Sequence, residues 1–176
     1  ALNCRLTDCT VTHVSSYAIE LRGGCRSNLI SGCTLTDLGA GGVKVGHDSS
    51  NTTVTDNEIS NGGLVHHGAV GIWIGHSWDN TVSHNHVHHL NYSGISVGWV
   101  WGYQPSKAAR NTIEYNHVHH IGQGMLSDLG GIYTLGVSPG TVIRNNLVHD
   151  VEAFSGAEMA TIPVATAEDL ELAVQR

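Results

Sequence analysis

The thirteen histidines of this sequence are clustered rather than scattered. The densest runs are HNHVHH at 84–89 and NHVHH at 116–120. Imidazole exchanges protons near neutral pH and hydrogen-bonds to hydroxyl groups, so these runs are candidates for acid–base chemistry or for sugar binding. We select His88, His119 and His120 as candidate substrate-binding residues.

Two other interpretations of the histidines are open. His, Asn and Asp suit tight turns and stacked columns, which is an architectural role. Imidazole is also a common ligand of transition metals. However, His88, His119 and His149 recur 31 and 30 residues apart, which stacks them in a column without directing them at one point. We therefore expect neither a metal site nor another cofactor.

A single acidic residue, Asp128, is the candidate catalytic group. It lies in the segment GQGMLSDLGGIYTLG at 122–136, just before a predicted strand and close to a pair of glycines. Glycines there let a backbone or a substrate approach closely. Met125, Leu126 and Leu129 make the setting partly apolar, which favours the protonated form that a general acid requires. The architectural alternative is a turn aspartate that accepts hydrogen bonds from backbone amides.

The loop at 98–110, GWVWGYQPSKAAR, carries three aromatic side chains, Trp99, Trp101 and Tyr103. Aromatic faces stack on the C–H faces of sugar rings, so these residues are candidates for a sugar-binding platform. The alternative is that they cover the side of the fold as packing. Further aromatic residues expected to extend the platform are Trp73, Trp78 and Tyr133.

An internal repeat must position these residues. The segments at 80–90, 111–121 and 140–151 align, and looser copies begin at residues 5, 29 and 53. Each copy is followed by a second short run, and both runs alternate with period two, as half-buried strands do. Successive copies are 24, 24, 28, 31 and 30 residues apart. Their aligned inner positions are Cys9, Cys33, Asn57, Asn85, Asn116 and Asn146.

Such units predict a β-solenoid, because one short coil buries its apolar positions only against the next coil. We expect an all-β fold, a right-handed parallel β-helix of about six coils over residues 1–155. The non-repeating tail at 156–176 is expected to be an end cap or an altered C-terminus, with a short helix from Thr166 or an irregular course.

Stacking of the coils also predicts columns of equivalent side chains. Outward columns should pair His86 with His117, and His88 with His119 and His149. An inward amide ladder should join the aligned asparagines. The inward aliphatic column should contain Val11, Leu35, Ile59, Val87, Val118 and Val148.

Composition excludes several classes of partner. The net charge is −7 and the 8 Lys and Arg form no cluster, which argues against nucleic acid. No run approaches ~18 consecutive apolar residues, so no membrane-spanning segment is expected. The four cysteines form no CxxC pair and are expected to be small buried thiols rather than disulfides or metal ligands. Because Ala1 already lies within a patterned segment, we expect the natural chain to begin earlier.

The runs at 84–102 and 111–155 resemble bacterial right-handed β-helix glycoside hydrolases, most closely glycoside hydrolase family 141, which includes xylanase and α-L-fucosidase activities. The similarity covers about residues 28–155. It implies a secreted, periplasmic or cell-surface enzyme acting on a polysaccharide or oligosaccharide. It also implies that Asp128, in the SDLGGIYTLG segment, is a catalytic residue.

The resemblance ends near residue 155. Enzymes of this kind continue into another Gly-Ile-Tyr strand with a second acidic residue, whereas this chain reads GAEMATIPVATAEDL from residue 156. Since glycoside hydrolysis ordinarily needs two carboxyl groups, Glu152 or Glu158 supplies the second, or it is missing and the chain is a fragment. Two alternatives stay open: a polysaccharide lyase of the same fold, disfavoured by the sparse basic residues, and a non-catalytic carbohydrate-binding or structural β-solenoid.

Overall fold

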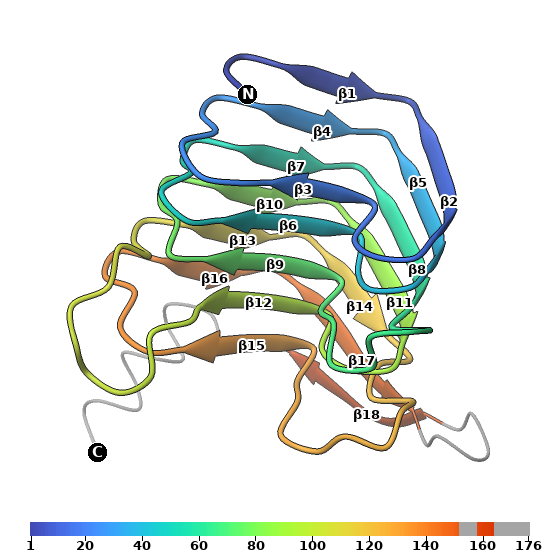
Figure 1. The fold of residues 1–176 in the computed structure, drawn as a ribbon. Helices are drawn as coiled ribbons and strands as arrows, with labels where there is room; N and C mark the ends of the chain where they lie inside the picture. Colours follow the sequence, from blue (N-terminus) through green and yellow to red (C-terminus); the bar gives the residue numbers. More distant parts are fainter. Residues whose placement is uncertain (152–157, 164–176) are drawn as a thin grey trace, which may run out of the picture.

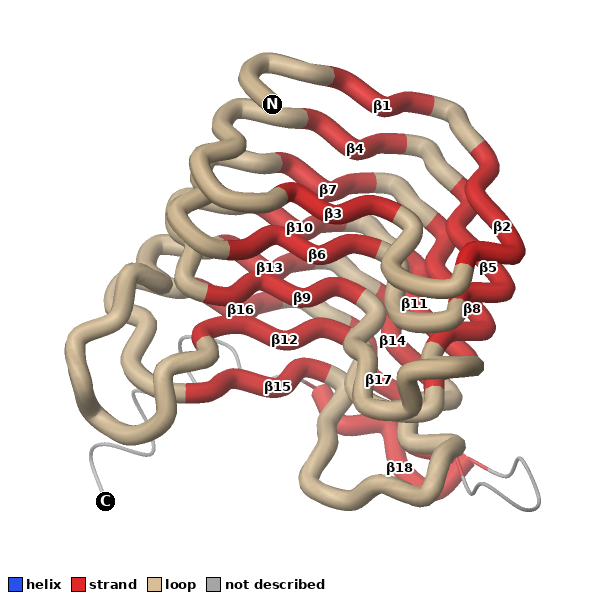
Figure 2. Tube along the Cα trace, viewed as in Figure 1, coloured by secondary structure: helices blue, strands red, loops and turns tan. Residues whose placement is uncertain are grey.

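The structure, a computed structural model, describes residues 1–151 and 158–163. The strands stack as successive coils from the N-terminal to the C-terminal end of the molecule (Figure 1). Figure 2 shows that the described chain consists of strands and loops. This confirms the all-β parallel solenoid and its coil number. Within the two described ranges, no helix is long and apolar enough to span a membrane.

Three sheets form the walls of the coil. Sheet I contains β1 (Arg5–Thr7), β4 (Leu29–Ser31), β7 (Thr53–Thr55), β10 (Thr81–Ser83), β13 (Thr112–Glu114) and β16 (Val142–Arg144). Sheet II contains β2 (Thr10–Val14), β5 (Thr34–Leu38), β8 (Glu58–Gly62), β11 (His86–Leu90), β14 (His117–His119), β17 (Leu147–Val151) and β18 (Glu158–Pro163). Sheet III contains β3 (Ile19–Leu21), β6 (Val43–Gly46), β9 (Ile72–Gly75), β12 (Ile95–Gly98) and β15 (Ile132–Leu135).

Apolar side chains at alternate strand positions point inward and stack along the axis of the coil. Leu35, Ile59 and Val87 are 0% exposed in the middle of the molecule. Burying a Val, Leu or Ile side chain contributes about 1.5–3 kcal/mol, so every coil adds to the same core. The strand pairing confirms the predicted aliphatic column of sheet II, which consists of Val11, Leu35, Ile59, Val87, Val118 and Val148.

Buried asparagines join the coils at the turn between sheets I and II. The Oδ1 atom of Asn116 accepts hydrogen bonds from the backbone N–H and from Nδ2 of Asn85, at 3.0 and 2.9 Å. The Nδ2 atom of Asn116 donates to the carbonyl of Val82 and to Oδ1 of Asn146, at 3.0 and 2.9 Å. Asn57 makes the same contacts to Asn85. The predicted amide ladder is confirmed, and it satisfies the hydrogen-bonding groups of each buried amide.

A second amide ladder lies at the turn that precedes sheet I. The backbone N–H and Nδ2 of Asn80 donate to Oδ1 of Asn111, while Oδ1 of Asn80 accepts from the backbone N–H of Thr52. Asn80 and Asn111 are 1% and 0% exposed. Asn80 and Asn111 are the first residues of two aligned copies of the repeat, so their spacing indicates this second ladder. Only the first ladder is predicted above from the sequence.

Residues with left-handed backbone form the corners of each coil. Asp56, His84 and Tyr115 have φ angles of 57°, 54° and 55° at equivalent positions before the first ladder. His89, near the end of β11, and His120, directly after β14, have φ angles of 53° and 49° at the next corner of their coils. Asn, Asp and His adopt this conformation more readily than most residues with a side chain. The corners therefore account for part of the histidine content, as the architectural interpretation expects.

The turn between sheets I and II has two residues in every coil, from 8–9 to 145–146. Coil length varies at other connections. The β8–β9 connection covers 63–71 and the β14–β15 connection covers 120–131, both at the start of sheet III strands. The β12–β13 connection covers 99–111, at the end of a sheet III strand. The longest loops therefore border sheet III.

The C-terminal tail contributes strand β18, which runs antiparallel to β17 along Leu147–Val151. It covers the outermost parallel strand of sheet II, and covering such an edge protects it from pairing with other chains. The helix predicted from Thr166 lies outside the described residues. All four cysteines are free thiols, and the expectation of burial holds for Cys25 and Cys33, whereas Cys4 is exposed.

Asn116→Asp tests the first ladder. The substitution removes the N–H donors that reach Val82 and Asn146 and sets a carboxylate against their oxygen atoms. We expect the free energy of unfolding to fall by about 3–5 kcal/mol, because one oxygen of the buried carboxylate then faces two acceptor oxygens without a donor. Chemical denaturation measures the change. The control is Asn145→Asp at an exposed corner, which should cost less than about 1 kcal/mol. Equal losses in the two variants would contradict a structural role for the ladder.

Candidate functional site

The outer face of sheet III carries a column of polar and aromatic side chains. Strand pairing places the outward residues of five successive coils side by side. The Lys44 ammonium lies 3.6 Å from the Glu20 carboxylate and 5.1 Å from the centre of the Trp73 ring, so charged and aromatic groups meet along the column. In coil order the column consists of Glu20, Lys44, Trp73, Ser96 and Tyr133.

Ser96 is the small member of this column, and the Trp99 side chain reaches it. Trp99 Nε1 donates to the Ser96 hydroxyl at 3.1 Å, and that hydroxyl donates to the Tyr133 carbonyl at 2.9 Å. The ring centres of Trp99 and Trp73 are 5.6 Å apart. Gly98, with φ of 119°, gives the backbone the conformation needed to turn at this point. The structure therefore gathers Trp73, Trp99 and Tyr133 on one wall.

Asp128 lies beside the Tyr133 end of the column. Its Oδ1 accepts a hydrogen bond from the Tyr133 hydroxyl at 3.1 Å, and its backbone carbonyl accepts one from the Tyr92 hydroxyl at 2.7 Å. Burial and the Asp128 carboxylate raise the pKa of Tyr133, so the phenol keeps the proton that it donates. The expected apolar setting is not formed, because the loop projects outward with Asp128 exposed and Met125 99% exposed.

An open groove of ≈ 570 Å³ lies at the other end of the column. Its walls include Glu20 and Lys44 from the sheet and His66 and His67 from the 63–71 connection. The Arg22 guanidinium donates to the Glu20 carboxylate at 2.8 Å and lowers the pKa of Glu20. The groove therefore offers an ionised carboxylate and a cation to a polar ligand.

The remaining aromatic candidates lie apart from this column. Trp101 and Tyr103 are 72% and 95% exposed on the 99–111 connection, so they do not serve as packing. That connection and the Asp128 loop are at opposite ends of the sheet III strands (Figure 1). Trp78 lies in the turn from sheet III to sheet I, where the Arg26 guanidinium is 5.6 Å from its ring centre.

The candidate histidines lie on a different wall, the outer face of sheet II. The pairing of β11 with β14 sets His86 beside His117 and His88 beside His119, as stacking predicts. The ring centres are 5.0 and 4.9 Å apart, with interplanar angles of 12° and 4°. His120 follows at the left-handed corner of the same coil. The structure thus brings these histidines together but separates them from Asp128 and the aromatic column by placing them on another sheet.

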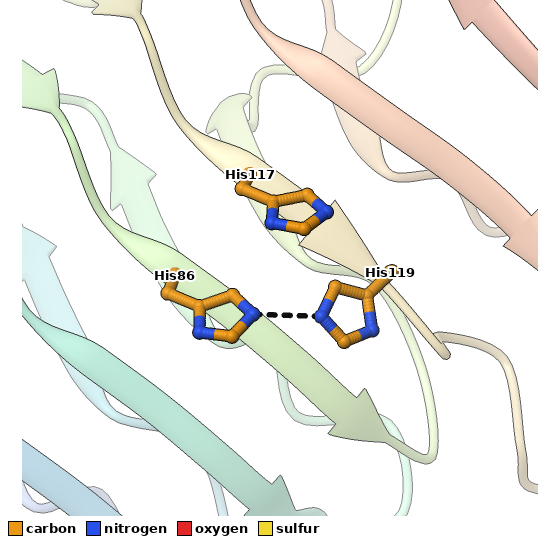
Figure 3. Close-up of side chains that lie close together, drawn as sticks. All are labelled: His86, His117 and His119. Carbon is orange, nitrogen blue, oxygen red and sulfur yellow. Dashed lines mark hydrogen bonds between the residues drawn. The ribbon is translucent and has the colours of Figure 1, made fainter.

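The two histidine columns converge between neighbouring coils (Figure 3). Nε2 of His86 lies 2.7 Å from Nε2 of His119, and ring nitrogens of His86, His117 and His119 all lie within 4.8 Å of one another. Stacking within single columns does not predict this diagonal contact. The sequence signal for it is the pair of outward positions on each strand, because residues two apart on a strand share a face.

Comparison with known proteins agrees with this geometry. The sequence model of the family described as the right handed beta helix region matches residues 2–160. The chain belongs to the right-handed β-helix family. A solved structure named "Glycoside hydrolase" is similar to this β-helix with a TM-score of 0.82 and 24% identity, over 89% of this chain and 29% of that chain. The chain therefore spans less than a third of that protein, and the likeness shows a shared fold. The comparison with curated proteins gives no match.

Crowding favours neutral histidines on sheet II of the β-helix. Burial, together with the neighbouring His117, His88 and His86 rings, lowers the pKa of His119 to about 3. Burial and neighbouring rings also lower the pKa of His117 and of His88, although the Glu58 carboxylate opposes the shift at His88. Each ring resists protonation because the proton would add a charge in a partly dry site beside other imidazoles.

The stability of the β-helix should therefore fall in mild acid. Unfolded histidines bind protons below about pH 6.5, whereas folded His119 does so only near pH 3. Its contribution is complete above pH 6.5 and is lost as pH falls towards 3. We expect the free energy of unfolding to be on the order of 1–3 kcal/mol lower at pH 5 than at pH 7, after allowance for partial exposure. Denaturation with a chelator present measures it, and equal stability at the two pH values would contradict it.

Proposed function

We propose that the outer face of sheet III binds an extended glycan and that the β-helix is part of a glycoside hydrolase. The observation that carries this proposal is the continuous line of contacts from Asp128 through Tyr133 and Ser96 to Trp99 and Trp73. It joins a carboxylate to an aromatic surface. Aromatic faces bind sugar rings and carboxyl groups cleave glycosidic bonds, so the line combines both requirements. The similarity in fold to a protein named "Glycoside hydrolase" supports the proposal.

The dimensions of sheet III favour a polymer over a small sugar. Neighbouring strands are about 4.8 Å apart, so the column from Glu20 to Tyr133 is about 19 Å long. The connections at 63–71 and 120–131 border one end of its strands, and the connection at 99–111 borders the other. A polysaccharide laid along the axis of the coil contacts the charged groove and then the aromatic rings.

In the proposed reaction Asp128 acts as general acid or base and Tyr133 orients its carboxyl group. The second carboxyl group must lie about 5–9.5 Å away. Glu20, at the far end of the column, is about 19 Å from Tyr133 and too distant. Glu152 and the side chain of Glu158 lie outside the described residues. We therefore propose that this chain binds the glycan. Hydrolysis is proposed only for a protein in which a second carboxyl group lies at that distance from Asp128.

The resemblance of residues 122–136 to glycoside hydrolase family 141 makes xylan and fucosylated glycans the first substrates to test. Such polymers occur outside the cytoplasm, so we propose a secreted, periplasmic or cell-surface location. Trp101 and Tyr103 are proposed as outer contacts for the same polymer. A substrate-binding role for His88, His119 and His120 stays a prediction, because they face away on sheet II.

Non-catalytic glycan binding is the second candidate function, and the exposure of Asp128 favours it. A general acid is usually held in a partly dry setting that keeps it protonated at neutral pH. The aromatic column is common to both candidates, so binding and turnover have to be measured separately.

Trp73→Ala tests the aromatic column. Removing the ring from the centre of the column should weaken binding of soluble xylan or fucosylated oligosaccharides at least about tenfold, equivalent to about 1.4 kcal/mol. Affinity electrophoresis or calorimetry measures the change. The matched control is Trp78→Ala, which removes a tryptophan outside the column and should leave affinity within about twofold. Equal losses would show that sheet III is not the binding face.

Asp128→Asn tests the catalytic assignment in the protein that hydrolyses the glycan. It should lower kcat at least about 100-fold, the usual contribution of a general acid or base, measured as released reducing sugar. The control is Asp56→Asn, another exposed aspartate at a left-handed corner. Full activity of Asp128→Asn would contradict the assignment. Binding without turnover would establish the non-catalytic candidate, and a product absorbing in the ultraviolet would indicate a lyase.

A further inference from the structure

Three histidines on the outer face of sheet II form a compact cluster, apart from the proposed glycan face. His86 comes from β11, whereas His117 and His119 come from β14 of the next coil (Figure 3). Nε2 of His86 is 2.7 Å from Nε2 of His119, and the His86 and His117 rings stack with centres 5.0 Å apart. Their ligand atoms lie within 4.8 Å of one another. Three imidazole nitrogens thus face one small volume.

The coil architecture does not require histidine at these positions. In the preceding coil, Glu58 pairs with His86 and Ser60 pairs with His88. One coil earlier, Thr34 pairs with Glu58, and the Thr36 hydroxyl accepts a hydrogen bond from Ser60. Those coils stack in the same sheet with the same register. His86, His117 and His119 therefore differ from His89 and His120, which have left-handed backbone that histidine adopts readily. The fold alone does not explain why histidine occupies these three positions on adjacent coils.

The spacing of the cluster suits a tetrahedral metal ion. A Zn²⁺ ion binds imidazole nitrogen at about 2.0–2.1 Å, which sets ligand nitrogens about 3.3 Å apart. The His86 and His119 Nε2 atoms are 2.7 Å apart, and all three ligand nitrogens lie within 4.8 Å of one another, so small side-chain rotations would bring them to that spacing. The ion would replace the N–H···N contact between His86 and His119. Three protein nitrogens leave a fourth position for water on this partly exposed face.

Neighbouring groups are placed to support a metal ion. Nδ1 of His119 lies 2.6 Å from Nδ1 of His120, so His119 can donate its remaining N–H while Nε2 stays free to bind. Metal-bound histidines are commonly oriented by such a contact. The Glu58 carboxylate belongs to a second group with His86 and His88, whose ligand atoms are also within 4.8 Å. Its negative charge offsets that of a cation.

We propose that His86, His117 and His119 bind a divalent transition metal ion of the Zn²⁺ class and that the ion links the fourth and fifth coils. His120 is a positioning residue that acts through His119. Because the ligands come from neighbouring strands of a parallel sheet, the ion adds a cross-link to the hydrogen bonds between the coils. The site is independent of the proposed glycan face on sheet III.

The test is a zinc titration of the full chain, purified without a histidine tag and treated with chelator. We expect one ion per chain, with a dissociation constant of about 1 μM or tighter, by calorimetry. Co²⁺ used as a second probe should give the visible absorption bands of a tetrahedral site. His86→Asn should weaken Zn²⁺ binding at least about 100-fold, and His120→Asn about 10–100-fold.

The matched control is His84→Asn, two residues away at an exposed corner that Asn adopts readily. It should bind Zn²⁺ within about twofold of the unsubstituted chain. Thermal unfolding of each metal-free variant verifies that it is folded, and Zn²⁺ should raise the unfolding temperature of the unsubstituted chain but not of His86→Asn. Absence of binding, or equal binding by His86→Asn and the unsubstituted chain, would overturn the proposal.

Discussion

The amide ladder between sheets I and II is the interaction on which the rest of this β-helix depends. Asn85, Asn116 and Asn146 are buried, so each side-chain donor and acceptor has to find a partner inside the molecule. They find it in the next coil and in the adjacent backbone. An extra residue in this turn would break those bonds, and the turn accordingly has two residues in every coil. Chain length therefore varies elsewhere, at the connections that border sheet III.

The contrast between the constant turn and the variable connections explains where the two sites lie. Sheet III, bordered by the variable connections, carries the aromatic and charged column, with Asp128 on one of the long loops. Sheet II follows the invariant turn directly, so its side chains are held in strict register from coil to coil. That register is what brings His86, His117 and His119 close to one another. The carboxylate beside sheet III therefore depends on a long connection, whereas the histidine cluster on sheet II depends on the constant length of the turn before it.

Much of the fold was predictable because equivalent residues recur at a readable spacing. The spacings of 28, 31 and 30 residues between the aligned asparagines reappear as hydrogen bonds between Asn57, Asn85, Asn116 and Asn146. The left-handed corners were not predicted individually, since Asp56, His84 and Tyr115 share a backbone conformation but no side-chain chemistry. The hydrogen bonds from Tyr133 and Tyr92 to Asp128 were not predictable either, because the conformation of a loop follows no sequence periodicity.

The invariant two-residue turn also makes the coil a unit of growth. A whole coil inserted between two others would find the same amide partners above and below and the same strand register on each wall. Each such unit would lengthen sheet III by one strand spacing, about 4.8 Å, and leave the width of its face unchanged. The number of coils in such a protein therefore sets, in steps of one strand spacing, the length of polymer that its face can bind.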